Sequence, residues 1–156
     1  MAKKILVAMD DSENAARAAE LVAKSFSVDN TIVLFNVMLD TAALCKMDSP
    51  ALSPLFKSQQ STFCALEDKK RELVTEAINR AKETLLSYGW PGDLIQVKIE
   101  NKKKGVARDI LDEAEKGYDL IVLGRRGISG LKDFFLGSTS NKVFTGAKDI
   151  SVLIAS

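Results

Sequence analysis

A glycine-rich stretch in the last third of the sequence has the residue types of an anion-binding site. Three glycines lie within residues 124–130, and a run of hydroxyl residues, 138–140, follows Gly137. Glycine has no Cβ, so the main chain at Gly124 and Gly127 can approach a ribose and its phosphates closely. The hydroxyl run opens an expected helix, whose unpaired amides and dipole favour a negative group. This spacing indicates an anion-binding crevice, and a plain turn that binds nothing is the alternative interpretation.

Binding at such a crevice needs more than the end of one helix. A helix dipole stabilises a bound charge by only about 0.3–1 kcal/mol, so several amides must act together with cations such as Arg126 or Lys132. The chain has neither the G-x-G-x-x-G dinucleotide fingerprint nor the G-x-x-x-x-G-K-[ST] phosphate loop. These absences disfavour an NAD-dependent enzyme and a P-loop NTPase.

A second candidate segment, residues 9–12, begins with Met9 and holds the acidic pair Asp10 and Asp11. It follows the first expected strand, as the glycine-rich stretch follows the fourth. Open parallel sheets bind ligands outside the carboxyl ends of their strands. If the first and fourth strands are neighbours, both segments face one crevice. Asp10 then stands at this crevice, or it serves only the loop and the start of the next helix.

The elements that must position these segments alternate along the chain. Short apolar runs and one alternating run predict strands at residues 4–9, 31–37, 94–99, 119–123 and 150–155. Helical spacing of apolar residues predicts helices near residues 12–26, 66–88, 107–116 and 138–145. This order predicts a single α/β domain over residues 1–156, with one mostly parallel sheet covered by helices on both faces.

Residues 38–64 lose this periodicity, so we expect a long loop that either folds back on its own domain or acts as a lid or contact surface. Ser49-Pro50 and Ser53-Pro54 each resemble a helix cap followed by proline, so a short helical turn is expected within it. Cys45 and Cys64 are too few for a zinc ribbon or a C-x-x-C pair. We expect reduced thiols there, and a disulfide closing the loop is the alternative.

Composition excludes several classes of function. The chain has 156 residues, 22 Lys and Arg against 21 Asp and Glu, and no histidine. Mechanisms that need a histidine base, and metal sites that need imidazole, are therefore excluded. The near-neutral charge favours neither nucleic acid nor an anionic membrane as a partner. The apolar run at residues 5–9 is too short for a signal peptide or a membrane span, so a cytoplasmic location is expected.

The sequence resembles the ATP-binding branch of the universal stress protein family. The family signature G-x2-G-x9-G-[S/T] is matched by Gly124, Gly127, Gly137 and Ser138. Residues 4–10, 119–124 and 151–154 resemble the family as well, so the likeness covers essentially the whole chain. It implies an open five-stranded sheet in the order 3-2-1-4-5, the Rossmann-like fold of adenine nucleotide alpha hydrolases. That order places the ends of the first and fourth strands side by side.

The resemblance also implies a set of nucleotide-binding residues. Asp10 matches an acidic residue at the nucleotide, Val37 a main-chain contact to the adenine, and Arg126 an added phosphate contact where the family often has a small residue or histidine. The implied site consists of Met9, Asp10, Val37, Leu123, Gly124, Arg126, Gly127, Gly137, Ser138, Thr139 and Ser140. A divalent cation, Mg²⁺ or Mn²⁺, would bridge the phosphates, since hard ions prefer oxygen ligands.

The implied function is a nucleotide-dependent regulator of the stress response that binds ATP, ADP or AMP with slow or no hydrolysis. No catalytic residue is identified, although weak ATPase activity or phosphorylation of a hydroxyl in 138–140 is compatible with the family. The resemblance further implies a homodimer through the last strand, 150–155, and an unidentified protein partner. An ATPase or adenylating enzyme of the same fold, and a nucleotide-free dimerising module, are the alternatives.

Overall fold

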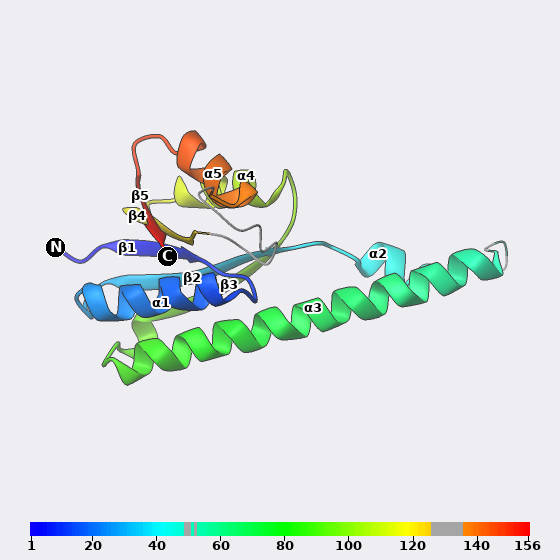
Figure 1. Ribbon diagram of the computed structural model, residues 1–156, viewed down its shortest axis with the longest axis horizontal. Coiled ribbons are helices and arrows are strands. Elements are labelled where there is room, and N and C mark those ends of the chain that lie inside the picture. Colours follow the sequence, from blue (N-terminus) through cyan, green and yellow to red (C-terminus); the bar gives the residue numbers. More distant parts are fainter. Residues whose placement is uncertain (49–50, 52, 126–135) are drawn as a thin grey trace.

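The fold is a five-stranded parallel sheet with helices on both faces (Figure 1). The computed structural model describes residues 1–48, 51, 53–125 and 136–156. The strands are β1 (Lys4–Ala8), β2 (Thr31–Met38), β3 (Ile95–Asn101), β4 (Leu120–Gly124) and β5 (Ser151–Ala155). Their order is β3-β2-β1-β4-β5, and every neighbouring pair is parallel. The predicted fold class and strand order are confirmed.

The helices cover the sheet in two layers. They are α1 (Glu13–Ser25), α2 (Ala42–Cys45), α3 (Pro54–Ser87), the 3-10 turn η1 (Gly92–Leu94), α4 (Val106–Ala114) and α5 (Ser138–Gly146). α1 and α3 cover one face and α4 and α5 the other (Figure 1). Alternate side chains of β1 enter the two cores, Ile5 and Val7 on one side and Leu6 on the other. An apolar run buried on both faces is what the sequence predicts for a central parallel strand.

Helix α1 begins where its capping residue predicts. The Ser12 side chain accepts a hydrogen bond from the Ala15 amide at 3.2 Å, so Ser12 rather than Asp11 is the N-cap. At the far side of the sheet, β3 is an edge strand, as its alternating pattern predicts. Its position at the edge is confirmed, but Val97 and Ile99 are 44% and 41% exposed, so the apolar residues of the alternation do not form one buried face.

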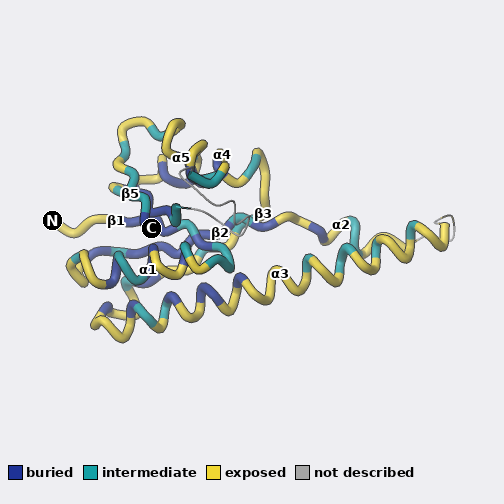
Figure 2. The backbone as a smooth tube through the Cα atoms, in the orientation of Figure 1, coloured by how far each residue is buried: buried dark blue, intermediate teal, exposed yellow. Residues whose placement is uncertain are grey.

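The prediction of a long loop over residues 38–64 is wrong for most of this segment. Helix α3 starts at Pro54 and runs for 34 residues, with the Ser53 hydroxyl accepting from the Phe56 amide at 3.1 Å. The Ser53-Pro54 start signal is therefore correct, whereas the helix expected from Leu66 begins too late. The apolar period appears late because the first buried residue of α3 is Val74. The helical turns before it lie beyond the sheet and are largely exposed (Figures 1 and 2).

The expectation of two reduced thiols is also wrong. Cys45, at the end of α2, and Cys64, in α3, form a disulfide, with their Cα atoms 5.9 Å apart. Because α3 starts early, Cys64 lies on a helix beside α2. The sequence did not predict this arrangement, because apolar residues have no regular helical spacing in this region. The disulfide alternative is the one that the structure contains.

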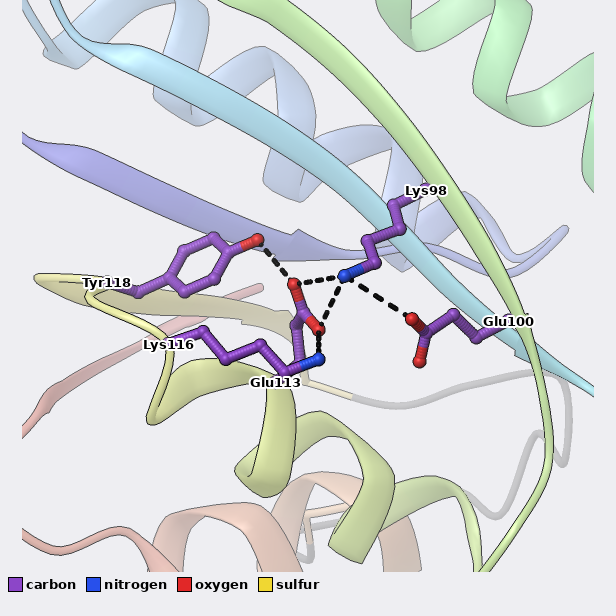
Figure 3. A network of polar contacts seen from close by, with 5 residues as sticks. All are labelled: Lys98, Glu100, Glu113, Lys116 and Tyr118. Carbon is purple, nitrogen blue, oxygen red and sulfur yellow. Dashed lines mark hydrogen bonds and ion pairs between the residues drawn. The ribbon is translucent and has the colours of Figure 1, made fainter.

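A buried carboxylate joins α4 to the edge strand (Figure 3). Glu113 is 3% exposed and accepts hydrogen bonds from Lys98 and Lys116 at 2.9 Å and from the Tyr118 hydroxyl at 2.8 Å. Burial alone would raise the pKa of Glu113, but these hydrogen bonds outweigh it and lower the pKa to about 2. Burial and the contact with Glu113 raise the pKa of Tyr118. Every polar group of this network has a partner, so its role is structural.

Candidate functional site

A cavity of about 360 Å³ opens at the carboxyl ends of β1, β2 and β4. The start of α5 and one side of α3 complete its walls, with Val106 and Ile110 of α4 between them. The place agrees with the rule for open parallel sheets, because chain connections leave β1 and β4 toward opposite faces there. The volume lies within the range of about 300–1,000 Å³ that is usual for small-molecule sites.

All predicted site residues in the described part of the chain line this cavity. They are Met9, Asp10, Val37, Leu123, Gly124, Gly137, Ser138, Thr139 and Ser140. Arg126, Gly127 and Lys132 lie outside the described residues. The two segments singled out in the sequence, one after β1 and one after β4, therefore meet at one place. Their contacts with a ligand stay a prediction.

The end of β1 is fixed to β2 by a pair of hydrogen bonds. The Met9 amide donates to the Phe35 carbonyl at 2.7 Å, and the Asn36 side-chain amide donates to the Met9 carbonyl at 2.6 Å. Asn36 is only 7% exposed, and its oxygen has no hydrogen-bond partner among the described residues. Asn36 is not among the site residues predicted from the sequence. The sequence nevertheless marks this residue, because Asn36 is the one amide in the apolar run of β2.

Asp10 serves the loop before α1 and also stands at the cavity, while its contact with a ligand stays a prediction. One carboxylate oxygen accepts from the Ser12 amide at 2.8 Å, which shapes the turn before α1. The same residue lines the cavity. Asp10 is therefore a loop carboxylate that also lines the cavity.

Gly124 and Ser140 connect the two halves of the site. The Ser140 hydroxyl donates to the Gly124 carbonyl at 2.8 Å, and Ser140 is 6% exposed. Its proton is therefore used within the protein, so Ser138 and Thr139 hold the hydroxyl donors that are left for a ligand. A Cβ on Gly124 would lie 2.8–2.9 Å from the main chain of Asn14 in α1. The close approach of α1 thus requires glycine here, a reason that the sequence analysis did not anticipate.

The start of α5 faces the cavity without a side-chain cap. Gly137 is the N-cap, in an extended conformation with φ −55° and ψ 156°, and it provides no side-chain cap hydrogen bond. Its amide donates to the Arg125 carbonyl at 2.9 Å, and the Arg125 amide donates to the Ala155 carbonyl at 2.7 Å, which fixes this end against β5. The first amides of a helix have no partner inside it. An uncapped, positioned helix start of this kind suits an anion.

One wall of the cavity comes from a helix that the sequence analysis did not connect with the site. Glu67, Lys70, Arg71 and Val74 of α3 line it, and the Arg71 guanidinium donates to the Leu39 carbonyl at 3.4 Å. Two cations and one carboxylate therefore face the site from α3. Predicting this wall requires the full length of α3 and the direction in which its residues face. Neither could be predicted, because no regular apolar spacing precedes Val74.

The lining of the cavity determines which chemical groups the site offers. The chain has no histidine, and the described residues contain no group of three or more Asp, Glu or Cys side chains placed to hold a metal ion. None of the helices in the described ranges is long and apolar enough to cross a membrane. The site offers main-chain amides, hydroxyls, the two carboxylates of Asp10 and Glu67, and the cations Lys70 and Arg71.

Comparison with known proteins agrees with this architecture. The family model described as "Universal stress protein family" matches residues 1–155. The universal stress protein YxiE of Bacillus subtilis (strain 168) is 30% identical over 147 residues, which cover 92% of each chain. Among solved structures, the universal stress protein UspA from Lactobacillus plantarum superposes with a TM-score of 0.69 at 23% identity, covering 99% of this chain and 97% of that one.

Two further solved structures contain a nucleotide. A universal stress protein in complex with cAMP has a TM-score of 0.63 at 15% identity, covering 99% of this chain and 96% of that one. A universal stress protein family protein from Arabidopsis thaliana with AMP bound has a TM-score of 0.57 at 16% identity, with 99% and 92% of the chains covered. At these identities the likeness establishes the shared fold alone.

Proposed function

Because the chain belongs to the universal stress protein family, we propose that it binds an adenine nucleotide, ATP first among them, in the cavity between β1 and β4. The observation that carries this proposal is the uncapped start of α5, which faces a cavity of suitable size. Relatives of the same fold that contain cAMP and AMP support the choice of a nucleotide.

The proposed ligand lies across the carboxyl ends of the strands. The amides and hydroxyls of Ser138 and Thr139 bind the phosphates, and Gly124 and Asp10 lie at the ribose side. The main chain of Val37, at the end of β2, meets the adenine edge. Gly127, outside the described residues, keeps the ribose and phosphate role that the family motif implies, and Arg126, also outside them, adds a phosphate contact.

A divalent cation fits this proposal only as a companion of the phosphates. The described residues provide no cage of three acidic or thiol ligands. Asp10 and the hydroxyls of Ser138 and Thr139 are oxygen donors at the cavity, and Mg²⁺ commonly binds through one or two carboxylates, phosphates and waters. We therefore propose that Mg²⁺ or Mn²⁺ arrives with the nucleotide.

We further propose a regulatory role, with slow or no hydrolysis. No histidine is available to activate a water molecule, so nucleotide binding rather than turnover is the event that a partner protein would sense. The proposal includes a cytoplasmic location and a homodimer. β5 is the sheet edge next to β4 and has no other neighbouring strand in the described sheet, so a second copy of β5 can pair with it.

Titration calorimetry tests the central claim. We expect saturable heat when ATP, ADP or AMP is added to the purified protein, and a change in ATP affinity when Mg²⁺ is removed. Mass spectrometry of the untreated protein should detect co-purified nucleotide. Heat no greater than dilution with all three nucleotides, at micromolar protein, would overturn the proposal. An ATPase and adenylation assay separates a regulator from an enzyme, since an enzyme shows turnover above background.

A further inference from the structure

The disulfide between Cys45 and Cys64 lies between the core of the domain and the N-terminal end of α3. Cys45 and Cys64 are the only cysteines of the chain and are bonded to each other. Both are half-buried, so a reductant can reach them. Disulfides in a reducing cytoplasm are usually transient and serve redox sensing or catalysis. A stable domain of this size does not need one.

The disulfide and the cavity share one face of α3. Gln60, Cys64, Glu67, Arg71 and Val74 follow one another at steps of four, three, four and three, which places them on a single helical face. Val74 is buried in the core, and Glu67 and Arg71 line the cavity. The disulfide therefore fixes both the position and the rotation of the part of α3 that forms the cavity wall.

Among the described residues, few other contacts hold this part of the helix. No residue of α3 before Val74 is buried. The Gln60 side-chain amide donates to the carbonyls of Leu44 at 2.5 Å and Met47 at 2.9 Å, and all of these groups lie beside the disulfide. The Arg71 contact with Leu39 is long, at 3.4 Å. Because isolated helical turns are marginally stable in water, the covalent bond is the strongest restraint on the wall.

We propose that Cys45 and Cys64 are a thiol–disulfide exchange site, and that the oxidised form holds Glu67, Lys70 and Arg71 in place for nucleotide binding. This inference rests on the proposed function. A dithiol reductant attacks one sulfur as a thiolate and forms a mixed disulfide, and its second thiol then releases the protein. Two electrons and two protons pass to Cys45 and Cys64, which become thiols, while the reductant becomes a disulfide. Reduction removes the covalent link between α2 and α3, leaves the Gln60 hydrogen bonds as the contacts between them, and loosens the cavity wall.

The experiment compares ATP binding to the full-length protein in its oxidised form and after treatment with a dithiol. Alkylation and mass spectrometry count the thiols in each sample. We expect the reduced form to bind ATP about five- to tenfold more weakly, a typical size for coupling between sites. Amide hydrogen exchange in residues 54–71 should become faster, while exchange in residues 74–85 stays slow. The exchange measurement reports on the wall without any nucleotide.

The double variant Cys45→Ala/Cys64→Ala provides the matched control. It should bind ATP like the reduced protein and should not respond to the dithiol, because no other cysteine exists. Equal ATP affinity in the oxidised and reduced forms would overturn the inference while leaving the proposed function intact. Absence of ATP binding in both forms would remove the proposed function and the coupling together. If hydrogen exchange in residues 54–71 does not change after reduction, that result alone would overturn the claim that the disulfide holds the cavity wall in place.

Discussion

The hydroxyl of Ser140 donates a hydrogen bond to the carbonyl of Gly124 across 2.8 Å. This bond connects the end of β4 with the first turn of α5, the two elements that contribute most to the predicted phosphate site. Because Ser140 is buried, the bond is shielded from water and keeps the amides of α5 in a fixed position relative to the sheet. A binding site that uses main-chain amides depends on such fixed positions.

Replacing Ser140 with alanine should therefore weaken the fold. Ser140→Ala leaves the half-buried Gly124 carbonyl without this donor, so we expect a loss of about 1–2 kcal/mol in the free energy of unfolding. Ser138→Ala, two residues earlier and exposed, is the control and should change stability by less than about 0.5 kcal/mol. Urea unfolding followed by circular dichroism measures both. Equal stability of the two variants would contradict a structural role for the Ser140 hydroxyl.

The amide of Ser138 can be removed without breaking the helix. Ser138 is the first residue of α5, and the extended conformation of Gly137 is compatible with a following proline. We expect Ser138→Pro to weaken ATP binding by roughly tenfold, since it removes one charge-assisted hydrogen bond. Ser138→Ala removes the hydroxyl and keeps the amide, so calorimetry on the pair separates the two groups. ATP affinity that is the same in Ser138→Pro and Ser138→Ala would argue against an amide contact with phosphate.

A methyl group at position 124 should disturb α1. The added Cβ in Gly124→Ala would lie 2.8–2.9 Å from the main chain of Asn14, so helix and strand must separate, at an expected cost of about 1–3 kcal/mol. Gly92→Ala is the matched control, because its Cβ would lie 3.8 Å from Leu86, an ordinary contact. Thermal unfolding of both variants measures the difference. A fully stable Gly124→Ala protein would show that the glycine does not serve the packing of α1.

Stability should fall in acid as Glu113 becomes protonated. Its pKa is lowered in the folded protein from 4.5 to about 2, so its contribution is complete above pH 4.5 and is lost as the pH falls toward 2. Urea unfolding between pH 7 and pH 2 should show this loss for the native chain. Glu113→Gln should be less stable at neutral pH, by about 1–3 kcal/mol, and should lose less stability in acid.

The exposed neighbour Glu115 supplies the control for that measurement. Glu115→Gln should follow the native profile between pH 7 and pH 2. If Glu113→Gln shows the same acid dependence as the native chain, other carboxylates are responsible for it.

The proposed homodimer predicts an effect at only one edge of the sheet. Val152→Lys places a charge on β5 and should convert a micromolar dimer into a monomer, as sedimentation equilibrium would show. Val97→Lys, on the opposite edge strand β3, where Val97 is already 44% exposed, should leave the association unchanged. A native protein that is monomeric at high concentration would exclude the β5 dimer.

The sequence predicted the helices and strands correctly wherever buried apolar residues recur with a regular spacing. β1 and β4 are continuous apolar runs because helices cover both faces of the sheet, and the site follows from where these strands end. The start of α3 was readable from Ser53 and Pro54, because capping is a local interaction. The length of α3, the disulfide and the wall formed by Arg71 were not readable, because they depend on an exposed helix that leaves no apolar pattern. Asn36 and the contact of Gly124 with Asn14 arise from tertiary packing and needed coordinates.

The uncapped start of α5 has a consequence for the stability of the folded protein. Many helices carry a serine or aspartate that satisfies their first amides, and this chain has Gly137 there instead. If a nucleotide phosphate completes that end, the nucleotide becomes a missing part of the folded state. The melting temperature would then rise with nucleotide concentration by mass action, so the lifetime of the folded protein in a cell would follow its supply of adenylate.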